Sequence, residues 1–401
     1  MNPSSSGWIH KFINDFPKKL LIDNYASPNV FYKQLKNTGF IYGVSVNTVL
    51  NEPISDLKLT KEEYTKVNLF HALWFTFFSE NPNNTHDEAI ETMVSFYKSI
   101  ERGKRSFFQK LGFSTSPSEN LEKIISARLQ ETNNLLKADA TSLLTYALLY
   151  VDVLAFSCYL SEPEGLKSYM DTLETILIEN SALALQSKKE KNKYDHLVIE
   201  LVSSSSEFYG TQPKTLNTKT SLLERQFILD ICCLAVWDDK ILDESELEFL
   251  KTLSGRLNFS EEHLTQNIDM LVEFSTMNAQ KIQLFEYAHP VAQFYKQSSK
   301  MVKLLILRNK RRLLTELNES GELLVLLGQS TTRDLSGEEK VKVKEQLLDI
   351  FKTVPSLTIF MLPGGALLLP LFVKLIPKLL PSAFQENRVE EKSKDGIIKS
   401  D

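Results

Sequence analysis

The sequence predicts an all-α protein, and three observations support that prediction. Glycine and proline are both scarce, with 14 of each in 401 residues. Helix-start signals recur along the chain, and apolar residues follow them at helical spacing. No stretch shows the sustained alternation of apolar and polar residues that is typical of a half-buried strand. We therefore expect multi-helix bundle domains without a sheet.

Helix starts are marked by capping boxes, in which an N-cap Ser, Thr or Asp precedes a Glu by three residues. Each side chain of the box then satisfies a backbone amide of the first turn that has no partner within the helix. The pairs that fit are Thr60/Glu63, Thr85/Glu88, Ser116/Glu119, Ser336/Glu339 and, as a variant, Asp243/Glu246. Pro117 follows Ser116 and is the preferred first residue of a helix.

Composition and motifs argue against an enzyme. The net charge of −5 excludes a polycation of the kind that binds DNA. The six histidines have no metal-ligand spacing, and no phosphate-binding, dinucleotide-binding or serine-hydrolase motif occurs. Cys158, Cys232 and Cys233 lie in apolar helical runs and are expected to be buried, reduced thiols. We expect no catalytic residues, no cofactor and no bound metal.

Breaks in the pattern divide the chain into five regions. The stretch Gly210–Thr220 contains Gly, Pro, Lys and four Thr, a composition typical of a linker. The predicted regions are an N-terminal helical region (1–210), a middle helical module (211–287), a stretch of basic and amphipathic helices (288–353), an apolar membrane segment (354–384) and a disordered charged tail (385–401).

The middle module resembles TerB-like domains around Leu234–Leu247. Asp239, Leu242 and Glu246 match that family's helix-turn-helix junction, whereas Lys240 replaces the usual Gly. The acidic residues there do not form an EF-hand loop, because neither register places oxygen ligands at the required positions. We interpret Asp243 as a helix cap that Glu246 completes, in preference to a cation ligand.

Twenty residues without a charge, Val354–Val373, predict a membrane segment. A helix of that length crosses about 30 Å of hydrocarbon. Pro355, Pro363 and Gly364-Gly365 disfavour an ordinary buried helix of a soluble protein, which is the alternative reading. The segment is expected to be either a membrane-spanning helix or a re-entrant hairpin that breaks at Pro363.

The same region resembles the LETM family, the leucine-zipper/EF-hand transmembrane proteins, and within it the bacterial LETM-related biofilm-associated branch. The resemblance covers about 65 residues from Leu335 to near Phe384. It rests on the proline spacings 7, 7 and 4, on the leucines before Pro370 and on a closing Leu-Pro-Ser-x-Phe. The motif residues are Pro355, Pro363, Gly364, Gly365, Pro370, Lys374, Pro377, Pro381 and Phe384.

The resemblance implies a protein of the bacterial inner membrane, with most of the chain cytoplasmic because no signal peptide is apparent. The family usually has an acidic residue within the span, where this chain has Ala366. The nearest carboxylate that could couple ion movement is Asp349. The ribosome-binding-like domain that follows the motif in the family is not expected here, since the chain ends about seventeen residues after Phe384.

A basic stretch precedes the LETM-like region. Seven basic and no acidic residues lie between Pro290 and Leu313. We define Lys303, Arg308, Lys310, Arg311 and Arg312 as the basic surface. Anionic lipid headgroups would attract it. A solvated helix face is an equally good interpretation, and RNA is a weaker one.

Three functions follow from these patterns. The first is a membrane-anchored, non-enzymatic LETM-like protein that supports ion homeostasis or envelope and biofilm physiology through a protein partner or a second copy. The second is a subunit of a cation/proton transporter. The third is a soluble helical adaptor whose hydrophobic helix binds a partner. Ala366 argues against the second, and the uncharged twenty-residue run argues against the third.

Overall fold

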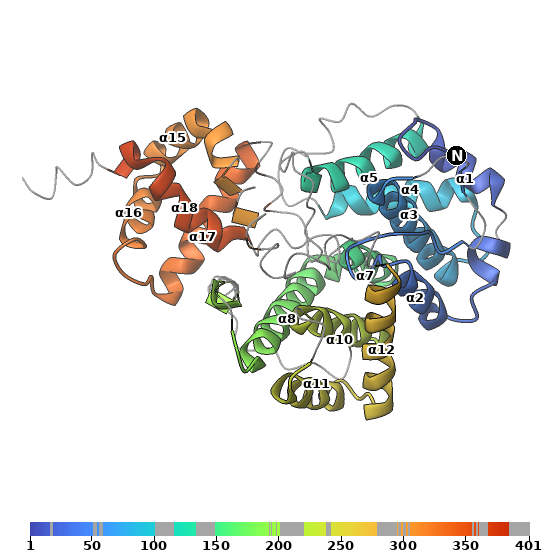
Figure 1. The fold of residues 1–401 in the computed structure, drawn as a ribbon. Helices are drawn as coiled ribbons and strands as arrows, with labels where there is room; N and C mark the ends of the chain where they lie inside the picture. Colours follow the sequence, from blue (N-terminus) through green and yellow to red (C-terminus); the bar gives the residue numbers. More distant parts are fainter. Residues whose placement is uncertain are drawn as a thin grey trace, which may run out of the picture.

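The computed structural model describes the chain up to residue 384 with several gaps. The residues outside the description are 17–18, 51–53, 56–58, 101–115, 134–148, 192, 194, 198, 201–219, 238–241, 279–294, 296–297, 300–301, 304, 355–356, 358–359, 361–367 and 385–401. Every regular element among the described residues is helical, which confirms the predicted fold class (Figure 1).

The helices before residue 200 pack around α3 (Lys61–Glu80). Because α3 carries apolar residues around its whole circumference, it must be covered on all sides. The helices α2, α4, α5 and α7 all contact it. The first part of the chain comprises α1 (Trp8–Asp15), the π-helix η1 (Lys19–Asp23), α2 (Pro28–Asn37), α3, α4 (His86–Ser99), α5 (Pro117–Asn133), α7 (Leu149–Ser161), the 3-10 helix η3 (Pro163–Gly165) and α8 (Leu166–Ser187).

The predicted capping boxes start the expected helices. Thr60, Thr85, Asp243 and Ser336 each accept a hydrogen bond from the backbone N–H three residues on, and the Glu at that position bonds back to the N-cap amide. At Ser116 the hydroxyl lies 3.5 Å from the amide nitrogen of Glu119. A further box, Ser221/Glu224, begins α10. These local signals therefore set the helix starts.

The helices α10 (Leu222–Val236), α11 (Glu244–Arg256) and α12 (Glu261–Met277) lie against the first part of the chain (Figure 1). α10 contacts α8 and α2 as well as α11 and α12. The apolar core is thus continuous from α2 to α12. The predicted linker, Gly210–Thr220, lies outside the described residues except for Thr220. The domain boundaries and the TerB-like assignment stay predictions.

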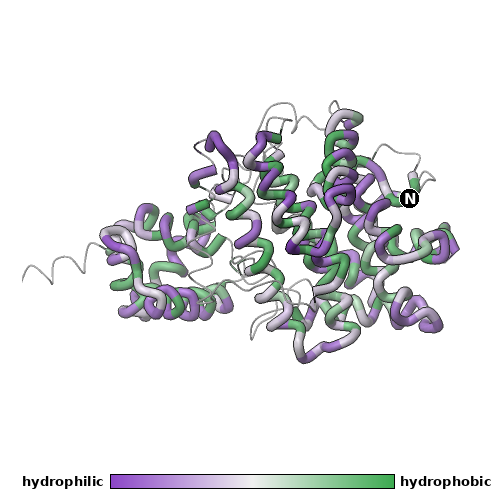
Figure 2. Tube along the Cα trace, turned by 90° about the horizontal axis from the view of Figure 1, so that it is seen from below, coloured by the Kyte–Doolittle hydropathy of each residue, from purple (hydrophilic) through white to green (hydrophobic). Residues whose placement is uncertain are grey.

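A second group of helices follows, comprising α15 (Lys310–Glu319), α16 (Gly321–Gln329), α17 (Gly337–Thr353) and α18 (Leu369–Leu379). It lies beside the α1–α12 group in Figure 1, and α16 contacts each of the other three helices. Figure 2 shows hydrophobic and hydrophilic residues alternating along the helices of both groups. Such amphipathic helices bury one face against their neighbours.

Within the described ranges, no helix combines the length and the apolar character that a bilayer crossing needs. Most of the predicted span Val354–Val373 lies outside those ranges, at residues 355–356, 358–359 and 361–367. The helix that contains its end, α18, has 11 residues. The membrane helix or re-entrant hairpin is therefore not confirmed and stays a prediction.

Candidate functional site

The apolar segment places aromatic rings in the core of the α15–α18 group. Phe360 stacks on Phe351 of α17 at 4.6 Å between ring centroids, and it meets Phe372 of α18 edge-on at 5.2 Å. All three side chains are at most 2% exposed. Such ring pairs add about 0.5–1.5 kcal/mol each beyond the burial of their area. The described residues at both ends of the segment are thus core residues of this group.

The described motif prolines lie near the two ends of α18. Pro370 occupies the first turn of α18, where its missing N–H costs nothing. Pro377 lies inside α18 and is buried, so the carbonyl four residues earlier has no helical donor. Pro381 is exposed just after α18. The half-buried ring of Phe384 approaches Gly328 at the end of α16.

Four other motif residues lie outside the described residues, as does Ala366: Pro355, Pro363, Gly364 and Gly365.

The charges that flank the apolar segment are exposed and paired. Lys352 donates to a carboxylate oxygen of Asp349 at 2.6 Å, and the Asp349 side chain is 72% exposed. Lys374 pairs with Glu200 at 2.8 Å, with both side chains about half exposed. Exposed pairs of this kind contribute little to stability. Asp349 therefore has the surroundings of a solvated carboxylate and not those of a buried coupling group.

The basic surface is exposed as a whole: Lys303, Arg308, Lys310, Arg311 and Arg312 all present their side chains to solvent. Within the part of the chain that the structure describes, none of them takes part in an ion pair. Leu307, an apolar residue among them, is 46% exposed. A cluster of solvated cations with an exposed apolar residue is typical of helices that bind a lipid surface.

In the middle module, Asp243 caps α11. Asp243 accepts hydrogen bonds from the Glu246 amide at 2.8 Å and from the Ser245 hydroxyl at 2.7 Å. These hydrogen bonds lower the pKa of Asp243, the Ser245 hydroxyl most of all. No group of metal-ligating side chains occurs among the described residues. Asp239 and Lys240 lie outside them.

Comparison with known protein families decides the character of the C-terminal region. A family model described as "LETM1-like, RBD" matches residues 335–400. This segment is similar to the LETM1-like family. The match begins just before α17, includes α18 and leaves α1 to α16 without an assigned family. No curated protein and no solved structure matches the chain.

The matched segment contains Asp349 and the whole proline motif. The match therefore confirms the predicted resemblance to the LETM family. The bacterial branch and the membrane role are not decided by the match. The basic surface ends at Arg312, upstream of the matched residues, in the helices that lead into them.

Sequence reasoning missed two buried polar clusters. In one, Arg128 forms two hydrogen bonds, of 2.9 and 3.0 Å, to Asp152, which is fully buried on α7. In the other, Asp230 of α10 binds Lys36 and Tyr32 of α2, each at 2.6 Å. The available signal was a single Asp within an otherwise apolar helical run. Buried carboxylates are almost always paired, so such a residue predicts a partner elsewhere.

Proposed function

We propose that this protein is a non-enzymatic LETM-like protein that binds an anionic membrane through its basic surface and is anchored there by the apolar segment of its LETM1-like domain. The observation that carries the proposal is the position of five exposed cations upstream of that domain, none of which has an ion-pair partner among the described residues. Anionic headgroups attract each Lys or Arg near the surface by about 1 kcal/mol. Through a protein partner or a second copy, the bound protein would support ion homeostasis or envelope and biofilm physiology.

Two features favour lipid over RNA as the partner of the basic surface. Leu307 is an exposed apolar residue among the cations, and its side chain can enter the headgroup region of a membrane. No aromatic residue occurs between Val302 and Leu314, whereas single-stranded nucleic acid is usually held by stacking on aromatic rings. The same cations without stacking partners would give RNA only a weak, salt-sensitive attraction.

The proposal is tested by flotation of the full chain with liposomes. The variant carries Lys310→Gln, Arg311→Gln and Arg312→Gln, and its matched control replaces three exposed cations elsewhere, Lys11, Lys167 and Arg256, by Gln. We expect the first variant to lose about 100-fold in affinity for anionic vesicles, from three charges of about 1 kcal/mol each. The control should bind like the wild type. Equal binding of both variants, or equal wild-type binding to zwitterionic vesicles, would refute the role of the basic surface.

The anchor is tested separately by carbonate extraction of cell membranes. Wild-type protein should stay in the pellet, while a variant with Phe372→Glu and Val373→Glu should be released, because charged residues are costly inside hydrocarbon. Since these two positions are buried, the folding of the variant is checked by circular dichroism. Release of the wild type by carbonate would exclude the anchor, but it would not contradict binding of the basic surface to anionic lipid.

A further inference from the structure

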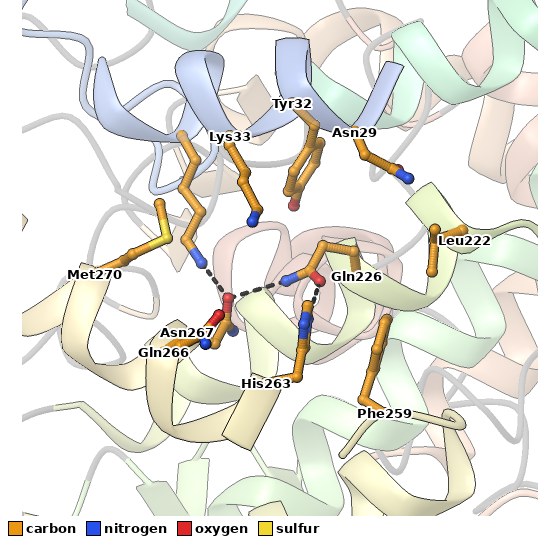
Figure 3. Close-up of a pocket in the computed structure, with 11 residues that line it drawn as sticks. Asn29, Tyr32, Lys33, Leu222, Gln226, Phe259, His263, Gln266, Asn267 and Met270 are labelled. Carbon is orange, nitrogen blue, oxygen red and sulfur yellow. Dashed lines mark hydrogen bonds between the residues drawn. The ribbon is translucent and has the colours of Figure 1, made fainter. Parts of the chain in front are cut away.

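A solvent-open pocket lies between α2, α10 and α12, and its lining residue nearest in sequence to the LETM1-like domain, Met270, precedes that domain by 65 residues. Its volume is about 180 Å³. Figure 3 shows its side chains converging from the three helices, with Lys33 pointing down from α2 toward Gln226 and His263. A cavity of about 150 Å³ is enough to hold a benzene-sized molecule. The pocket is therefore large enough for one small organic molecule and too small for a nucleotide.

The floor of the pocket is a buried hydrogen-bond network. Lys36 donates to Asp230 at 2.6 Å and also donates to the side-chain oxygen of Asn267. Tyr32 donates its hydroxyl to the other Asp230 oxygen at 2.6 Å. Lys36 and Asp230 are 2% and 1% exposed, so the charges neutralise one another away from water. This floor carries no net charge and does not need an added cation.

Gln226 extends this network to the wall. Its side-chain nitrogen donates to Asp230 at 3.2 Å and to Asn267 at 2.9 Å, so its oxygen is left to accept. The acceptor role requires that the Nε2–H of His263, 2.5 Å away, donates to it. This bond fixes the orientation of the imidazole ring. The ring of Phe259 stacks on it at 4.3 Å with an angle of 8° between the planes, giving the pocket a wall of two parallel rings.

One cation of the pocket is uncommitted. Lys33 is exposed, lines the pocket and has no ion-pair partner within the described part of the chain. Burial lowers the pKa of His263, and the charges of Lys33 and Lys36 lower it further, while Asp230 opposes them. The lowered pKa favours the neutral imidazole, so the positive charge that the described lining offers to a ligand is that of Lys33. A single positive charge above a neutral polar floor favours a monoanion.

We propose that this pocket binds a small planar carboxylate, about the size of benzoate, with its carboxylate at Lys33 and its flat part against the His263–Phe259 wall. A phosphate group fits less well, because the described lining offers no arginine fork for bidentate binding. A metal cation fits less well, because Lys36, Tyr32 and Gln226 already occupy both oxygens of Asp230. The pocket is independent of the membrane function proposed above.

The test uses full-length protein, with benzoate as the probe and benzamide as its neutral isostere. Isothermal titration should show saturable benzoate binding, about fivefold tighter than benzamide binding, since an exposed ion pair is worth up to a factor of that size. Lys33→Gln should abolish the preference for benzoate. This substitution changes an exposed side chain and is expected to fold normally. Added salt should weaken benzoate binding to the wild type and not to the variant.

Two controls locate the effect. Lys11→Gln removes an exposed charge outside the pocket and should leave the benzoate preference intact. The triple glutamine variant at Lys310, Arg311 and Arg312 should also retain it, because those residues lie in the basic surface. Absence of saturable benzoate binding, equal affinity for benzoate and benzamide, or an unchanged preference in Lys33→Gln would each overturn the proposal. Loss of the preference in either control would assign benzoate to nonspecific surface binding and overturn it as well.

Discussion

Acidification should destabilise the N-terminal helices through one buried histidine. His71 of α3 is 1% exposed, and one ring nitrogen, Nε2, donates to the carbonyl of Leu21 at 2.8 Å. The other nitrogen, Nδ1, has no hydrogen-bond partner among the described residues. The rings of Phe12, Tyr25 and Phe31 surround the imidazole at 5.1 to 5.9 Å between centroids. A proton added to Nδ1 would be a buried donor without an acceptor.

The magnitude follows from the pKa of His71, which burial lowers from 6.5 to about 4. The folded state requires the neutral ring, whereas the unfolded chain takes up a proton below about pH 6.5. The contribution of His71 is therefore intact above pH 6.5 and is lost as the pH falls toward 4. The full loss is about 3 kcal/mol, of which about 2 kcal/mol occurs between pH 7.5 and pH 5.

The assay is urea unfolding at several pH values, monitored by tryptophan fluorescence, since Trp8 and Trp74 are buried in the same helices. The comparison is with His71→Gln, whose amide can still donate to the Leu21 carbonyl and does not titrate. Carboxylates contribute equally to both proteins, so the difference between their pH dependences isolates His71. The wild type should lose about 2 kcal/mol more than the variant between pH 7.5 and pH 5. Equal losses would refute the reasoning.

Three further predictions concern other sites. Asp243→Ala should lower the free energy of unfolding by about 1 kcal/mol, the usual cost of a lost helix cap. Calcium should not alter the thermal stability of the wild type, and a calcium-dependent increase that the variant lacks would contradict this. Asp152→Asn should lower the free energy of unfolding by about 3–5 kcal/mol in chemical denaturation, because it removes the carboxylate that accepts two hydrogen bonds from the buried Arg128; a loss below about 1 kcal/mol would show that the pair is solvated. Purified protein in liposomes should not exchange cations for protons, since Asp349 is exposed and paired; flux that Asp349→Asn abolishes would identify it as the coupling site.

The sequence predicted those features whose causes lie within a few residues. Capping boxes such as Thr60/Glu63 and Asp243/Glu246 need only a spacing of three, so the helix starts were found where they occur. The LETM1-like segment was found because its proline spacing is itself local. By contrast, Tyr32 and Asp230 are 198 residues apart in sequence and 2.6 Å apart in space. No local pattern could pair them, so the polar pocket between α2, α10 and α12 was not predicted.

The basic surface and the apolar segment would act at a membrane in two distinct steps, surface binding and anchoring. The cations of the basic surface are already exposed, so their attraction to anionic headgroups requires no change in fold. The described apolar residues Leu357, Phe360 and Phe372 are instead buried in the protein core, and insertion would remove them from that core. The face of α17 that packs on them through Phe351 would then need a new apolar partner. Anchoring therefore requires a rearrangement of the LETM1-like domain, whereas surface binding does not, and only anchoring should change the exposure of Phe351 to solvent.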